Sequence, residues 1–120
     1  MSAQRTLRGC GTAIVTPVAD GQLDEPALRG LVSWQIGEGI DFLVACGSTG
    51  EAQTLSDAER ERVVHIVADE ARGRVPVVAG ATSNDTARAV DETRRMCQAG
   101  ASFILSAAPP YNKPTAEGMY

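Results

Sequence analysis

Short, largely apolar segments alternate along the chain with longer amphipathic segments. The apolar segments span residues 12–16, 41–46, 75–79 and 102–106, so their starts are 29, 34 and 27 residues apart. Segments that are apolar throughout, rather than at every second position, are typical of strands buried on both faces. A repeat of about 30 residues matches a right-handed βα crossover unit, so we predict a parallel sheet.

Three amphipathic helices are predicted between these strands. The first should begin at Asp24, with Pro26 in its first turn, and the second at Ser56, where Glu59 completes a capping box. The third should begin near residues 84–85. The positions expected to be buried are Leu28, Leu31, Val32 and Ile36 in the first helix, Val63, Ile66, Val67 and Ala71 in the second, and Ala87, Val90 and Met96 in the third.

The predicted units fit two architectures, a doubly wound open sheet and an eight-stranded barrel. A TIM (β/α)8 barrel typically has about 250 residues, whereas this chain has 120. A fourth helix should open after Pro114, with Thr115 as its N-cap, and Tyr120 interrupts it in its first turn. We therefore predict an α/β fold in which residues 1–120 form the amino-terminal half of a single barrel domain, about four βα units, with no second domain.

Composition excludes several classes of partner. Eleven basic and fifteen acidic residues give a net charge of −4, which argues against a nucleic-acid surface. Three widely spaced cysteines and one histidine favour neither a disulfide framework nor a metal site. No segment approaches the roughly 18 apolar residues of a membrane span. We expect a cytoplasmic protein with no metal, cofactor or membrane partner.

Small and hydroxyl-bearing residues follow each predicted strand. The segment 41–46 runs into Gly-Ser-Thr-Gly-Glu at 47–51. The first predicted strand ends in Thr16-Pro17, and the third and fourth are followed by Thr82 and by the segment 109–112. Parallel strands place these residues at one edge of the sheet, where α/β folds hold their ligands. Flanking glycines free backbone N–H groups, and two hydroxyls add donors, so a carboxylate or phosphate could bind there. A tight turn before the next helix is the alternative interpretation.

These motifs resemble those of the dihydrodipicolinate synthase and N-acetylneuraminate lyase superfamily of class I, Schiff-base aldolases. The resemblance runs from Gly11 to Tyr120. It is strongest in Ala-Ile-Val-Thr-Pro at 13–17, the loop at 47–51, Pro-Val-Val-Ala-Gly at 76–80 and Pro-Tyr-Asn-Lys-Pro at 110–114. The segment Tyr111–Gly118 resembles the dihydrodipicolinate synthase branch in particular.

The resemblance implies a Schiff-base condensation of pyruvate with aspartate semialdehyde in lysine biosynthesis, through the diaminopimelate pathway. It also implies a homotetramer, a dimer of dimers, that needs no cofactor. In such enzymes a barrel lysine forms an imine with pyruvate. Ser48 and Thr49 would then bind the pyruvate carboxylate. Ser48 would relay protons together with Tyr111, which would reach in from a neighbouring subunit.

The family's imine-forming lysine, its second relay tyrosine and its substrate arginine all lie on later strands, beyond this sequence. Lys113 is the only lysine here and matches no nucleophile position. We therefore expect the isolated chain to be inactive. Two alternatives stay open: a sister pyruvate-dependent aldolase that acts on N-acetylneuraminate or a keto-deoxy sugar acid, and an inert half-barrel or phosphate-binding module.

Departures from the family pattern concern regulation. Relatives that lysine inhibits bind it with histidines and a glutamate near the second and third helices. Asp57, Arg60 and Arg88 stand at those positions, Pro110 replaces a tyrosine, and Asn84 is kept. Because an arginine in place of the glutamate repels an ammonium group, the complete enzyme is predicted to be insensitive to lysine.

Overall fold

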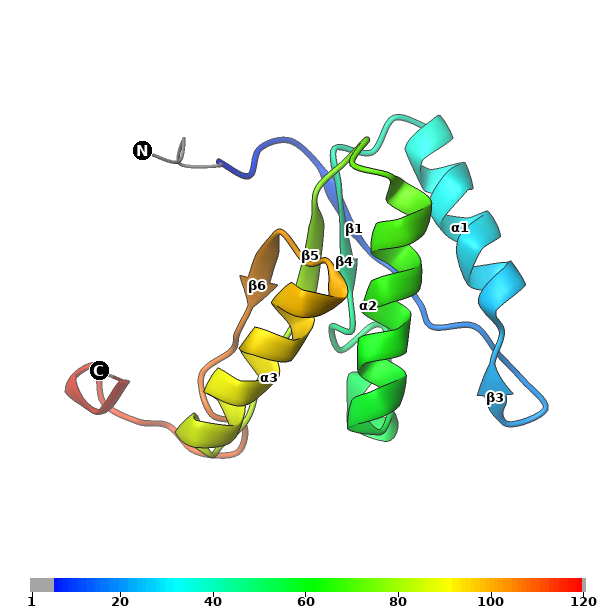
Figure 1. Cartoon of the computed structure of the whole chain (residues 1–120). Coiled ribbons are helices and arrows are strands. Elements are labelled where there is room, and N and C mark those ends of the chain that lie inside the picture. The colour runs from blue at the N-terminus through cyan, green and yellow to red at the C-terminus, as the bar shows by residue number, and fades with distance from the viewer. Residues whose placement is uncertain (1–5, 120) are drawn as a thin grey trace.

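In a computed structural model, which describes residues 6–119, a four-stranded parallel sheet carries three helices on one face (Figure 1). Each strand pairs in parallel with the next one in the sheet, and a helix follows each of the first three. The prediction of consecutive βα units is therefore confirmed. In sheet order the strands are β1 (Gly11–Ala13), β4 (Phe42–Ala45), β5 (Val77–Gly80) and β6 (Phe103–Leu105).

Each helix begins at a side-chain cap, as predicted. The helices are α1 (Glu25–Gly37), α2 (Asp57–Ala71) and α3 (Thr86–Ala99). Asp24 accepts a hydrogen bond from the N–H of the third helical residue of α1, and Asp85 caps α3 in a similar way. Ser56 and Glu59 form a reciprocal capping box at the start of α2. The sequence signals therefore fix where all three helices start.

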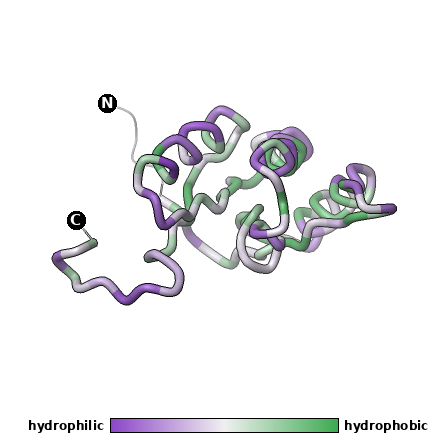
Figure 2. The backbone as a smooth tube through the Cα atoms, turned by 90° about the horizontal axis from the view of Figure 1, so that it is seen from below, coloured by the Kyte–Doolittle hydropathy of each residue, from purple (hydrophilic) through white to green (hydrophobic). Residues whose placement is uncertain are grey.

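The hydrophobic core lies between the sheet and these helices. Seen from below, hydrophobic residues follow the strands, while hydrophilic residues line the outer sides of the helices (Figure 2). Helix α2 packs between α1 and α3 and also against β4 and β5. The four positions predicted to be buried on α2 are buried, and Val64 joins them. On α1, Leu28 and Val32 are fully buried.

The predicted buried face of α3 is wrong in part. Met96 is fully buried, but Ala87 is exposed and Val90 is 45% exposed. The face that packs toward α2 carries Glu92, Met96 and Ala99, which are spaced as neighbours on one side of a helix. Ala87 and Val90 lie outside this stripe, so the helix buries a carboxylate in place of two apolar side chains.

Three short features complete the described chain, and one of them is the 3-10 helix η1 (Ala52–Thr54), which precedes α2. A hairpin of β2 (Val18–Ala19) and β3 (Gln22–Leu23) turns at Asp20 and Gly21, with φ values of 52° and 76°. An Asp-Gly pair is the usual signal for such a turn, although the hairpin was not predicted. Near the end, Thr115 accepts the Gly118 N–H at 3.2 Å and so begins the 3-10 helix η2 (Glu117–Met119). Tyr120, at the end of the predicted fourth helix, lies outside the described residues.

Candidate functional site

Ser48 lines a cavity of about 280 Å³ at the carboxyl ends of the strands. Gly47 and Ser48 reach it from the end of β4, Thr82 from beyond β5, and Ala107 from beyond β6. Arg60 of α2 also borders the cavity. The structure thus brings the residues that follow three different strands to one place, as the parallel sheet predicted.

The loop Gly47–Glu51 forms a tight turn and leaves several of its backbone N–H groups without a backbone acceptor. Its turn closes when the Glu51 N–H donates to the Ser48 carbonyl at 3.1 Å, and Glu51 itself has a left-handed φ of 54°. Among the backbone hydrogen bonds of residues 6–119, none is donated by the N–H groups of Ser48, Thr49 or Gly50. The structure therefore confirms the tight turn, and this turn leaves amides unpaired that would suit an anion. Anion binding by the loop stays a prediction.

The start of this loop lies directly against the end of β5. A methyl group added to Gly80 would come within 2.0 Å of the Cys46 carbonyl oxygen and within 3.3 Å of the Gly47 nitrogen. Both contacts are with backbone atoms, which cannot move aside as a flexible side chain can. Glycine at position 80 is therefore what lets the two strand ends approach each other closely.

The structure separates the predicted site residues. Ser48 lines the cavity, whereas Thr49 is exposed in the same loop and does not line it. Tyr111 is fully exposed, with a left-handed φ of 73°, although its neighbour Pro110 borders the cavity. A relay between Ser48 and Tyr111 would need a neighbouring subunit and stays a prediction.

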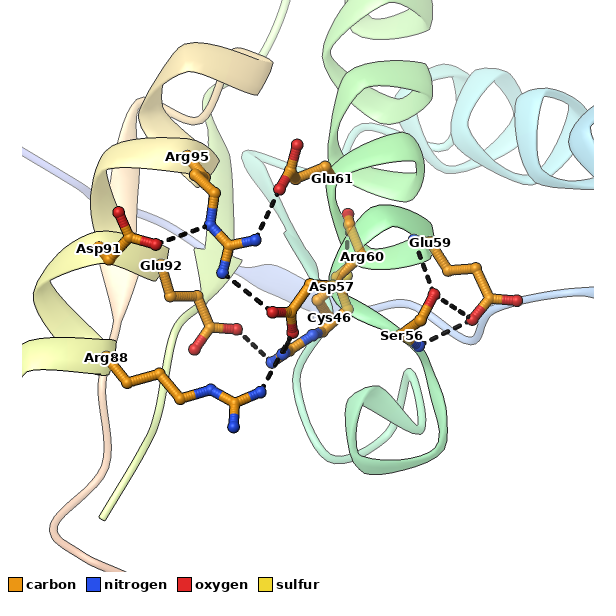
Figure 3. Close-up of polar contacts among 10 residues, drawn as sticks. All are labelled: Cys46, Ser56, Asp57, Glu59, Arg60, Glu61, Arg88, Asp91, Glu92 and Arg95. Atoms are coloured by element: carbon orange, nitrogen blue, oxygen red, sulfur yellow. Dashed lines mark hydrogen bonds and ion pairs between the residues drawn. The ribbon is translucent and has the colours of Figure 1, made fainter. Parts of the chain in front are cut away.

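A buried ion pair that was not predicted from the sequence reaches the cavity through Arg60. Arg60 pairs with both Glu92 and Asp57, and its side chain is 13% exposed while that of Glu92 is 1% exposed (Figure 3). The hydrogen bond from Arg60, and after it that from Arg95, holds the pKa of Asp57 below its ordinary value. Glu92 lies four residues before Met96, on the same side of the helix. A carboxylate at such a position was the one sequence signal that could have indicated a buried ion pair.

More exposed pairs surround this buried one. Arg95 on α3 contacts Asp57 at 3.2 Å and Glu61 at 2.9 Å on α2, and Asp91 at 3.2 Å on its own helix (Figure 3). Arg88 contacts Asp57 at 3.4 Å. Three of the positions that the resemblance connects with lysine binding, Asp57, Arg60 and Arg88, therefore belong here to an internal ion-pair network that joins α2 to α3.

Cys46 at the foot of the loop is not a nucleophile. Burial raises the pKa of its thiol to about 12, and the thiol donates to the Arg60 carbonyl oxygen at 3.6 Å. Its left-handed φ of 55° is unusual for a residue with a side chain and fits the sharp turn from strand to loop. Cys46 therefore serves the packing of the site.

The residues that the structure describes contain no group of three or more His, Cys, Asp or Glu side chains placed to hold a metal ion. Within residues 6–119, none of the helices has the length and apolar character needed to cross a membrane.

Comparison with known proteins gives matches over nearly the whole chain. The model of the dihydrodipicolinate synthetase family matches residues 6–120. A Nitrobacter hamburgensis protein named 4-hydroxy-tetrahydrodipicolinate synthase is 55% identical over 120 residues, which are all of this chain and 40% of that protein. A protein of the same name from Acidobacterium capsulatum is 56% identical over 116 residues, 95% of this chain and 38% of that protein.

Solved structures give the same result for the fold. The 4-hydroxy-tetrahydrodipicolinate synthase of Methylacidiphilum fumariolicum matches with a TM-score of 0.91 and 38% identity, over 95% of this chain and 38% of that one. The chloride-inhibited dihydrodipicolinate synthase of Acinetobacter baumannii, solved with pyruvate, matches with a TM-score of 0.90 and 42% identity, over 95% of this chain and 40% of that one. The chain spans about two fifths of these relatives and has the fold of the first four βα units of a TIM barrel.

Proposed function

Since the chain belongs to the dihydrodipicolinate synthetase family, we propose that it is the amino-terminal part of a 4-hydroxy-tetrahydrodipicolinate synthase. Residues 1–120 would form half of one barrel domain. The enzyme, a lyase of the class I aldolase type, would condense pyruvate with aspartate semialdehyde in lysine biosynthesis. The observation that carries this proposal is 55% identity along the whole chain to a relative of that name.

The geometry of the loop supports a specific role in this reaction. The N–H groups of Ser48 and Thr49 have no backbone acceptor, and two hydroxyls lie beside them, so they suit the carboxylate of pyruvate. A carboxylate held there would present its keto carbon toward the barrel interior. A lysine outside residues 1–120 would add to that carbon and expel water to form an imine.

Proton movement is the second role that we propose for this chain. Once the imine has formed, the pyruvate methyl group must lose a proton before its carbon can attack the aldehyde. Ser48 would pass protons together with Tyr111 of a neighbouring subunit, which fits a side chain that is fully exposed in the single chain. This role requires an oligomer, which we propose to be a homotetramer in the cytoplasm. The imine itself activates the methyl group, so the reaction needs no metal or cofactor.

Trapping with borohydride tests the proposed reaction. The complete reading frame that contains this sequence is expressed, and its product is called the full-length protein below. With pyruvate and borohydride, the full-length protein should gain one reduced pyruvate adduct on a lysine outside residues 1–120. A separate, untreated sample should consume aspartate semialdehyde with pyruvate in preference to sugar aldehydes. The isolated chain should gain none, because Lys113 is exposed and does not line the Ser48 cavity. An adduct on Lys113, or a preference for sugar aldehydes, would contradict the proposal.

We also propose that lysine does not inhibit the full-length protein. Arg60 and Arg88 place two cations where an ammonium group would bind, and Asp57 is already paired with both of them. The rate of condensation should stay the same when lysine is added up to roughly 10 mM, about ten times the upper end of typical KM values. Half-inhibition below 1 mM would refute this expectation.

A further inference from the structure

Thr16 connects the end of β1 to the candidate carboxylate loop, 34 positions further along the chain. Its side chain is buried, and its hydroxyl donates a hydrogen bond of 2.7 Å to the carbonyl oxygen of Gly50. The backbone pairing between β1 and β4 extends to Ile14, whose N–H donates to the Val44 carbonyl at 3.0 Å. Thr16 therefore lies two residues beyond an anchored part of the sheet.

Gly50 is packed against the end of β1. A methyl group added to it would lie 3.1 Å from the Ile14 carbonyl oxygen and 3.3 Å from the Thr16 hydroxyl. The other hydrogen bonds to the loop's carbonyl groups come from nearby in the sequence: from Ala52 to Gly47 at 3.4 Å, from Glu51 to Ser48 at 3.1 Å, and from Thr54 to Glu51 at 2.9 Å. Among the hydrogen bonds of residues 6–119, the bond from Thr16 is the one that joins a carbonyl group of this loop to the segment after β1.

We propose that Thr16 is a positioning residue for pyruvate: by holding the Gly50 carbonyl, it orients the preceding N–H groups of Ser48 and Thr49 toward the substrate carboxylate. This inference rests on the proposed function, because it takes the loop to be the carboxylate-binding element. A buried carbonyl that loses its donor turns toward any other donor within reach, water included. The N–H groups of Ser48 and Thr49, which lie in the same turn as Gly50, would then no longer both point toward the substrate carboxylate.

Three variants of the full-length protein test this role. Thr16→Val keeps the shape of the side chain and removes the donor, whereas Thr16→Ser keeps the donor. Thr12→Val is the matched control, because Thr12 lies in β1, four residues before Thr16, and its hydroxyl donates to Gln35 at 2.9 Å, away from the loop. Thr16→Val should raise the KM for pyruvate about tenfold while kcat at saturating pyruvate changes less than about threefold. Thr16→Ser and Thr12→Val should leave that KM within about twofold of the wild-type value.

Hydrogen exchange gives a readout that does not depend on catalysis. Thr16→Val should increase deuterium uptake in the peptide that contains residues 47–52, because the turn that closes from Glu51 to Ser48 opens more often. Thr16→Ser should not. Unchanged uptake and an unchanged KM in Thr16→Val would overturn the inference while leaving the proposed function intact. Increased uptake in Thr16→Val, combined with a wild-type protein that traps no pyruvate, would instead support the link from Thr16 to the loop and refute the proposed function.

Discussion

Replacing Gly80 with alanine should destabilise the full-length protein by about 3 kcal/mol and greatly weaken pyruvate binding. The added methyl group would lie 2.0 Å from the carbonyl oxygen of Cys46 and 2.8 Å from its carbonyl carbon. Because these are backbone atoms, the end of β4 must move away from β5, and Ser48 moves with it. Urea denaturation measures the loss of stability, and borohydride trapping at low pyruvate measures the loss of binding.

Gly30→Ala is the matched control for this prediction. Gly30 lies on the exposed side of α1, and nothing lies within 4 Å of a methyl group added there. Because alanine favours the helix, this change should stabilise the protein by roughly 0.5–1 kcal/mol. A Gly80→Ala protein with the stability and pyruvate affinity of the wild type would show that the strand ends do not meet as the structure describes.

Replacing Glu92 with alanine should destabilise the full-length protein by about 3–5 kcal/mol, because it leaves the Arg60 guanidinium buried without its most buried partner. The carboxylate is 1% exposed and the guanidinium 13% exposed, so water cannot take the place of the lost partner. Chemical denaturation at neutral pH measures the effect. Replacing both residues together, by Arg60→Met and Glu92→Leu, should recover most of the lost stability.

Asp91→Ala is the control for Glu92. Asp91 is the preceding residue and pairs with Arg95 at 3.2 Å, but its side chain is 63% exposed. An exposed pair contributes little, so this change should alter stability by less than about 1 kcal/mol. If Glu92→Ala and Asp91→Ala had equal effects, the pair between Arg60 and Glu92 would not be buried in the protein.

The order of elements could be predicted from the sequence because their signals are local. Ser56 and Glu59 mark the start of α2 within a single turn, and Asp24 does the same for α1. Strands buried on both faces have a continuous apolar pattern that does not depend on which neighbours they meet. The family motif at 47–51 likewise indicates Ser48, which the structure places at a cavity, while the role of Ser48 stays a prediction.

What could not be predicted depends on contacts between distant residues. Helical periodicity placed Val90 inside, but the direction of α3 is set by its packing on α2, and this packing buries Glu92 instead. The hydrogen bond from Thr16 to Gly50 crosses from one strand to the loop of another, so no spacing along the chain could reveal it. Such contacts follow from the arrangement of the sheet and hold the loop in place.

The most direct test of the account is a crystal structure of the full-length protein soaked with pyruvate. The carboxylate oxygens should lie about 3 Å from the N–H groups of Ser48 and Thr49, with the keto carbon joined to a lysine of a later strand. Pyruvate bound elsewhere, with the amides of residues 48–50 turned toward other protein groups, would contradict the account.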